Sequence, residues 1–306
     1  MRGVQPEETL GDRYTGALLG LAAGDALGTT VEFKPRGTFE PLTDIVGGGP
    51  FHLPPGYWTD DTSMALCLAE SLVECGGFDV RDQIERYCAW YERGHWSSTG
   101  RCFDIGNTTR AALERYRATG DPLAGSTDPG SAGNGCIMRL APVPLFFHAD
   151  VGVAIEHAGR SALTTHGAPE CVESARLLGA LLVRALDTTI KEDVLGGAQS
   201  LVFDSARLQA IARGAYVDKD ARDIRGSGYV VDCLEAALWC FARTESFTDA
   251  VLAAANLGDD ADTTAAVCGQ LAGAFYGERG IPALWIKRLA RADDIRQLAL
   301  RLMTRE

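Results

Sequence analysis

Two short acidic runs carry the residue types best suited to chemistry in this chain. Residues 59–62 read Thr-Asp-Asp-Thr, and residues 258–264 read Gly-Asp-Asp-Ala-Asp-Thr-Thr. No Lys or Arg lies close to either run in the sequence, so the carboxylates would repel one another unless a positive charge lay among them. Carboxylate and hydroxyl oxygens, with no Cys or His inside the runs, suit hard cations such as Mg²⁺, Mn²⁺ or Ca²⁺.

Each run precedes sequence that predicts a helix. The apolar stretches 63–68 (Ser-Met-Ala-Leu-Cys-Leu) and 265–268 (Ala-Ala-Val-Cys) follow directly. One run alone would most simply cap its helix, because Asp and Thr accept hydrogen bonds from the first backbone N–H groups. Two such runs that meet in space could instead hold two ions, the arrangement that clamps oxygens during hydrolysis.

Two further carboxylates have ordinary explanations from the local pattern. Glu32 lies in the segment 30–33, which we expect to be extended and to stop at Pro35, and periodicity alone makes it a solvated surface charge. Asp104 would be the N-cap of a helix that continues through Tyr116. Asp25, near the end of the first helix, is either a buried carboxylate held by backbone donors or a support for the site.

Three other polar features give weak signals on their own. Residues 120–135 are rich in glycine, which is typical of a flexible loop, although such a loop can also wrap a phosphate. His166 lies alone between two predicted helices, where a structural role is usual. Tyr229 reads as a core aromatic residue.

Charge excludes several classes of partner. The 29 Lys and Arg residues against 41 Asp and Glu residues give a formal net charge of −12 in 306 residues. Such acidity argues against nucleic acid or an anionic membrane surface as a partner. A polyanionic substrate would also be repelled unless bound cations reversed the local field.

The cysteines and the chain start indicate a cytoplasmic protein. Nine cysteines, an odd number with no C-x-x-C pair, are mostly embedded in apolar helical sequence and read as free buried thiols. Residues 1–13 are charged and do not resemble a signal peptide. No apolar run reaches the roughly 20 residues of a membrane span.

Hydrophobic spacing predicts an all-α fold, a compact multi-helix bundle formed by residues 1–306 as one domain. Apolar residues recur three to four apart in most segments, and no alternating strand pattern is convincing. Asp12 or Thr15 would cap the first helix, which runs to Leu27; Asp79 and Ser246 would cap others. Met138 and Arg139 would open a helix, and Asp293 or Asp294 would cap the last one.

Ordered motifs along nearly the whole chain resemble the ADP-ribosylglycohydrolase family. They comprise Gly-Leu-Ala-Ala-Gly-Asp-Ala-Leu-Gly at 20–28 with Glu-Phe at 32–33, the acidic runs, Phe-Asp-Ile-Gly-Asn-Thr at 103–108, Ala-Gly-Asn-Gly-Cys-Ile-Met-Arg at 132–139, Thr-His at 165–166 and Gly-Tyr-Val-Val-Asp at 228–232. A chance match would not reproduce six or seven motifs in the same order. The resemblance implies an orthogonal helical bundle that hydrolyses a glycosidic bond to ADP-ribose.

The resemblance also assigns roles. The metal ligands would be Thr59, Asp60, Asp61, Asp260, Asp262 and Thr263, holding two Mg²⁺ or Mn²⁺ ions, and the substrate contacts would be Asn107, Gly133, Asn134, Gly135, Met138, His166 and Tyr229. Asp104 or Glu32 would transfer the proton to the leaving group, and the sequence does not choose between them. Asp259 stands where some relatives have glycine, which leaves metal preference open.

The expected reaction is removal of ADP-ribose from a mono-ADP-ribosylated protein, with arginine favoured as the linkage. The alternatives are another linkage (serine, O-acetyl-ADP-ribose or a nucleobase) and a non-catalytic ADP-ribose-binding relative. The partner would be an ADP-ribosylated protein or an ADP-ribose derivative, and we expect a monomer.

Overall fold

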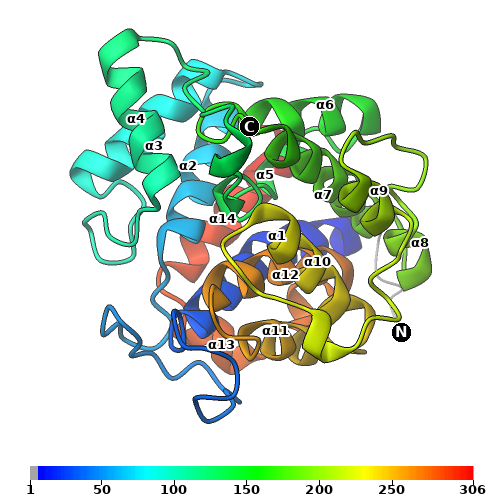
Figure 1. Cartoon of the computed structure of the whole chain (residues 1–306). Coiled ribbons are helices and arrows are strands. Elements are labelled where there is room, and N and C mark those ends of the chain that lie inside the picture. The colour runs from blue at the N-terminus through cyan, green and yellow to red at the C-terminus, as the bar shows by residue number, and fades with distance from the viewer. Residues whose placement is uncertain (1–5, 306) are drawn as a thin grey trace.

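The computed structural model describes residues 6–305 and shows an all-α architecture within that range (Figure 1). The α-helices are α1 (Pro6–Gly28), α2 (Asp60–Glu74), α3 (Val80–Arg93), α4 (Asn107–Thr119), α5 (Pro142–Phe146), α6 (Val151–Ala162), α7 (Pro169–Asp187), α8 (Lys191–Leu195), α9 (Ala206–Ala212), α10 (Val230–Ala242), α11 (Phe247–Ala255), α12 (Ala261–Tyr276), α13 (Ala283–Arg288) and α14 (Ala292–Thr304). Residues 6–305 form isolated β-bridges but no strand. The prediction of an all-α fold is confirmed.

Helices α1 and α12 pack against each other along their length and lie at the centre of the molecule, with α1 in blue and α12 in orange in Figure 1. Small residues four apart make this possible. A Cβ atom added to Gly20 would lie 2.4 Å from the carbonyl oxygen of Gly269, and one added to Gly24 would lie 2.1 Å from that of Ala265. Only hydrogen at these positions lets the two backbones approach so closely.

This close packing sets the end of α1 against the start of α12. A Cβ on Gly28 would meet the Cα of Asp262 at 2.4 Å. The loop that leaves α1 therefore begins beside the second acidic run. Apolar residues from most of the helices form a shared buried core around the pair. None of the described helices is both long and apolar enough to cross a membrane.

Several predicted helix ends are confirmed. The Asp79 side chain accepts hydrogen bonds from the backbone N–H groups of Arg81 and Asp82 at the start of α3. Ser246 caps α11 as expected, because its hydroxyl accepts from the backbone N–H of Asp249 at 3.1 Å and donates to the Asp249 carboxylate at 2.7 Å. Helix α2 stops at Glu74, just before Gly76, whose φ of +60° favours glycine.

The predicted start of the first helix is wrong. Helix α1 spans Pro6–Gly28. Asp12 and Thr15 therefore lie inside the helix. The Asp12 carboxylate accepts from the N–H of Arg279 at 3.2 Å, and Thr15 donates to the carbonyl of Gly11 at 3.1 Å.

Four other local predictions fail where tertiary contacts decide the backbone. Residues 30–33 form a turn and not an extended segment, with Phe33 at φ +62°. Gly106, not Asp104, is the N-cap of α4. Arg139 lies in a turn before α5 and opens no helix. Asp293 and Asp294 lie in the first turn of α14, whose N-cap is Arg291.

Candidate functional site

The two acidic runs meet at the N-terminal ends of α2 and α12. The Thr263 hydroxyl lies 3.2 Å from Oδ1 of Asp61 and donates to it. Asp61 and Asp262 are almost completely buried, while Asp260 is partly buried. The structure thus brings together two segments that are far apart in the sequence, as expected.

Asp25, completely buried near the end of α1, holds the first run in place. Its Oδ1 accepts from the backbone N–H and the hydroxyl of Thr59, both at 2.9 Å. Its Oδ2 accepts from the N–H of Thr62 at 3.0 Å and from the hydroxyl at 2.6 Å. Asp25 is therefore both a buried carboxylate held by backbone donors and a support for the site, the two explanations that the sequence leaves open.

Glu32 reaches the site from the turn after α1. The N–H of Phe33 donates to the carbonyl of Asp259 at 2.7 Å, and the N–H of Asp259 donates to the carbonyl of Lys34 at 2.8 Å. These two bonds tie the turn to the second acidic run. Glu32 is 4% exposed, so the expectation of a solvated surface charge from periodicity is wrong.

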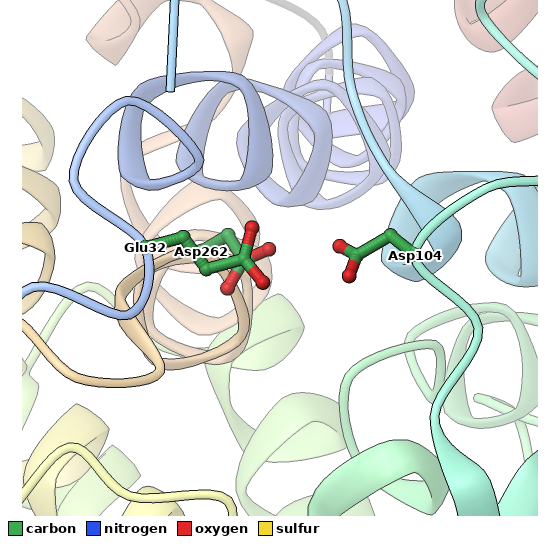
Figure 2. Close-up of side chains that lie close together, drawn as sticks. All are labelled: Glu32, Asp104 and Asp262. Carbon is green, nitrogen blue, oxygen red and sulfur yellow. The ribbon is translucent and has the colours of Figure 1, made fainter. Parts of the chain in front are cut away.

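Asp104 approaches from a third segment, the loop before α4. Its φ of +59° is uncommon for a residue with a side chain, although Asp tolerates it better than most. Figure 2 shows Glu32 and Asp262 pointing toward Asp104 from the opposite side. One carboxylate oxygen from each of the three residues lies within 4.8 Å of the other two, close enough for one cation to contact all three.

Burial and mutual repulsion raise the pKa values of these carboxyl groups. Burial, reinforced by the neighbouring carboxylates, raises the pKa of Asp104 to about 11. Burial is also the largest cause for Glu32, whose pKa rises to about 8. The pKa values of Asp60, Asp61 and Asp262 are raised well above their ordinary range for the same reasons.

The donor set fits a divalent cation. Oδ2 of Asp61 is buried and has no hydrogen-bond partner within the described chain. In residues 6–305, the ion pairs formed by Lys, Arg and His involve none of the clustered carboxylates. A hard cation would satisfy the free oxygen and remove the repulsion at once.

A cavity of about 690 Å³ opens over this cluster. Twelve of the residues expected to act as catalysts, metal ligands or substrate contacts line it, namely Glu32, Asp60, Asp104, Asn107, Gly133, Asn134, Gly135, Met138, His166, Asp260, Asp262 and Thr263. Thr59, Asp61 and Tyr229 do not line it. The cavity is therefore acidic on one wall and glycine-rich on another.

The glycine-rich wall is held by the acidic one. Nδ2 of Asn134 donates to Oδ2 of Asp260 at 2.6 Å, and its backbone N–H donates to the carbonyl of Gly228 at 3.1 Å. A Cβ on Gly135 would lie 2.6 Å from Cε1 of His166, so only glycine leaves room for the imidazole.

A buried Arg orients His166. Arg139 is completely buried and donates to the carbonyl of Gly135 at 2.8 Å and to the Thr165 hydroxyl at 2.6 Å. That hydroxyl lies 2.8 Å from Nδ1 of His166. Because Arg139 can only donate, the Thr165 proton is available for Nδ1, and we assign the imidazole proton to Nε2. Burial, followed by the charge of Arg139, lowers the pKa of His166 to about 3, so the ring is neutral.

Sequence reasoning missed Arg139 as a member of the site. Its signal was present, because Arg ends the 132–139 motif, but a buried guanidinium without a carboxylate partner cannot be read from spacing. Tyr229 was expected in the pocket. It does not line the cavity. Its hydroxyl donates to Glu170, the guanidinium of Arg207 lies 5.7 Å from its ring centroid, and its contact with the substrate stays a prediction. Asp259 is exposed at the cavity edge with φ +55°, a conformation that suits the glycine expected in relatives.

Comparison with known proteins identifies the family. A family model described as ADP-ribosylglycohydrolase matches residues 6–306. The chain is 46% identical over 297 residues to the ADP-ribosylarginine hydrolase Tri1 of Serratia proteamaculans, covering 97% of this chain and 80% of that protein. It is 48% identical over 300 residues to the protein of the same name from Pseudomonas putida, covering 98% and 80%.

More distant and structural matches agree. The ADP-ribosyl-[dinitrogen reductase] glycohydrolase of Rhodospirillum rubrum is 33% identical over 282 residues, covering 91% of this chain and 90% of that protein. A solved ADP-ribosylglycohydrolase-related protein complex matches with a TM-score of 0.87 and 45% identity, covering 97% of this chain and 99% of that chain. The cavity described above joins clustered carboxylates to a glycine-rich wall. On the match of the family model, this chain belongs to the ADP-ribosylglycohydrolase family of glycosidic-bond hydrolases.

Proposed function

We propose that this chain hydrolyses the bond between ADP-ribose and an arginine side chain of a modified protein, and that it needs a divalent cation to do so. Relatives at 46% and 48% identity are named ADP-ribosylarginine hydrolases, which supports arginine as the linkage. The observation that carries the proposal is the meeting of Glu32, Asp104 and Asp262, which come from three segments, in the cavity.

The cation sites would use the oxygens of the two acidic runs, with Mg²⁺ or Mn²⁺ as the ions. The proposed ligands are Thr59, Asp60, Asp61, Asp260, Asp262 and Thr263, with Glu32 and Asp104 within reach of the same space. When bound, two such ions would hold the ribose hydroxyls, orient a water and offset the negative charge of the diphosphate.

The glycine-rich wall would bind the diphosphate. The backbone N–H groups of Gly133 and Asn134 already donate to the carbonyls of Ser131 and Gly228. The donor that we propose for a phosphate oxygen on this wall is the neutral His166, with its proton on Nε2. Behind that wall, Arg139 is a buried positive charge that hydrogen-bonds Gly135, which favours an anion in the cavity.

Asp104 is the proposed proton donor. In the reaction the C1–N bond breaks, the oxygen of water bonds to C1, and the guanidine nitrogen takes a proton. Glu32 lies beside Asp262, whereas Asp104 faces both from the other side (Figure 2). Asp104 is thus placed to protonate the leaving group. Glu32, which a bound cation would keep ionised, would accept the proton that the water loses.

The test compares release of ADP-ribose from arginine-ADP-ribosylated and serine-ADP-ribosylated protein with Mg²⁺, with Mn²⁺ and with EDTA. We expect release of ADP-ribose from the arginine substrate, and we expect EDTA to abolish this release. Asp104→Asn should lower kcat by about a hundredfold or more while Mn²⁺ still binds by calorimetry. Asp218→Asn, an exposed control, should match the wild type. Release in EDTA would contradict the cation requirement, and release from serine alone would contradict the linkage.

A further inference from the structure

A second hollow adjoins the cavity at Asp104. Its volume is about 600 Å³, and three of its lining residues, Phe33, Asp104 and Ile105, also line the main cavity. The remaining aromatic rings around it belong to Phe51, Tyr91 and Phe103. The two hollows therefore adjoin each other at Asp104, the residue that we assign as proton donor.

We propose that this second hollow binds the arginine side chain of the modified protein, that is, the leaving group of the reaction. The inference rests on the proposed function. If ADP-ribose occupies the main cavity, the group attached to C1 must leave past Asp104, because that carboxyl protonates it. The second hollow begins at this residue, so the leaving group enters it directly.

The chemistry of the hollow suits a guanidinium. A planar cation binds well against aromatic faces and beside a carboxylate, and the hollow offers both. Phe51 and Phe103 form an edge-to-face pair with ring centroids 5.3 Å apart, so their rings have defined positions. Asp104 lies at the inner end, and its carboxylate faces the guanidinium once its proton has passed to the leaving group.

Phe33 is exposed in a way that the fold alone does not explain. It is 68% exposed although it is a large apolar residue, and it is held at φ +62° by the hydrogen bond to Asp259. A bulky residue in this conformation costs energy that the surrounding structure must offset. Phe33 lines both hollows, so with ADP-ribose bound its ring would lie near the bond that is cleaved.

Arg110 defines the orientation of the ligand. It also lines the hollow, is exposed, and donates to the carbonyl of Ile105 at 3.5 Å. The ion pairs of residues 6–305 do not include one between Arg110 and Asp104. A bound guanidinium would be repelled near Arg110 and attracted to the Asp104 carboxylate once that group has given up its proton. Arg110 would then face peptide carbonyl groups of the modified protein.

The test uses Phe51→Leu, because Leu keeps the apolar volume and removes the ring. Phe51 lines the second hollow but not the main cavity. For an ADP-ribosylarginine peptide we expect KM to rise about fivefold to tenfold, the loss of one partly desolvated cation–π contact. The Kd of free ADP-ribose should be unchanged. Leu284→Ala, at a surface Leu that is 64% exposed, should change neither value.

A binding experiment on the wild type tests the hollow separately from catalysis. With ADP-ribose saturating, N-acetylarginine amide should bind and N-acetylcitrulline amide, the neutral analogue of similar shape, should bind at least about tenfold more weakly. Phe51→Leu should weaken only the arginine compound. An unchanged KM in Phe51→Leu, or equal binding of the two amides, would overturn the inference. Failure of the wild type to cleave the arginine substrate would instead overturn the proposed function, since the amide experiment needs no turnover.

Discussion

Among single residues, Asp25 has a large effect on the site without lining the cavity. Its two carboxylate oxygens receive four hydrogen bonds from Thr59 and Thr62, at 2.6 to 3.0 Å. These bonds fix both the backbone and the hydroxyls of the run that contains Asp60 and Asp61. The geometry of the proposed cation ligands therefore depends on a residue that does not touch the cation.

We predict that Asp25→Asn lowers both stability and cation affinity. The Asn amide keeps one acceptor oxygen, but its NH₂ group would face the N–H and hydroxyl donors of a Thr residue. The free energy of unfolding should therefore fall by about 3 kcal/mol. The affinity for Mn²⁺ should fall about tenfold or more, because residues behind the ligands orient them. Urea unfolding and calorimetry measure the two effects. A variant with wild-type values for both would show that the run holds its shape without Asp25.

Glu70 provides a pH prediction away from the site. It accepts from His95 at 2.6 Å and pairs with Arg86. Burial opposes its ionisation, but the hydrogen bond from His95 and the charge of Arg86 outweigh burial and lower its pKa to about 2. Because the folded pKa lies below the usual value of 4.5, the stabilisation is complete above about pH 4.5 and is lost as the pH falls toward 2.

Glu70→Gln should therefore be less stable than the wild type by about 2 kcal/mol at pH 7, and the difference should vanish near pH 2. Urea unfolding from pH 7 down to the lowest pH at which both proteins fold would measure it. Glu40→Gln, at an exposed position, is the matched control and should show no such pH dependence. A difference between Glu70→Gln and the wild type that stays constant with pH would contradict the assignment.

At the scale of elements, the contact between α1 and α12 aligns the site. These helices deliver the turn with Glu32 and the run with Asp262, and glycines four apart keep their axes close. Gly24→Ala should cost about 3 kcal/mol, because the new methyl group would lie 2.1 Å from a backbone oxygen that cannot move aside. Activity should fall as well, since separated helices would displace the carboxylates.

Gly11→Ala in the same helix is the matched control. A Cβ there would meet its nearest atom at an ordinary 3.6 Å, so the higher helix propensity of Ala should stabilise the protein slightly, by about 0.5 to 1 kcal/mol. Thermal unfolding of both variants measures the contrast. Equal effects at the two positions would mean that the close packing is not what holds α1 to α12.

The elements also show how far sequence reasoning reaches. Helices with apolar residues three to four apart, and caps such as Asp79, could be predicted because their signals are local. The turn at Phe33 and the left-handed backbone of Asp104 could not, since both arise from contacts with distant segments. The sequence motifs contain most of the residues that line the cavity. Only the fold shows that Arg139 lies behind the glycine-rich wall and that Tyr229 is hydrogen-bonded to Glu170.

For the whole molecule, the net charge of −12 and the buried acidic cluster predict that divalent cations stabilise the fold. Without a cation, the raised pKa values of Asp61 and Asp262 mean that the cluster must take up protons or suffer repulsion. An ion that binds only the folded state at about a hundred times its Kd adds about 2.7 kcal/mol. For a chain of 306 residues this corresponds to a rise in Tm of about 4 °C.

Differential scanning calorimetry with Mn²⁺, with Mg²⁺ and with excess EDTA measures this shift. Asp262→Asn should fold, because it removes one repelling charge, but its Tm should no longer respond to either ion. Na⁺ at matched ionic strength should not reproduce the wild-type shift, because it screens surface charge without filling the buried cluster. If the ions raised the Tm of Asp262→Asn and of the wild type by the same amount, they would be binding to the acidic surface in general. The carboxylates brought together by α1, α2 and α12 would then have to be charge-neutral through protonation alone.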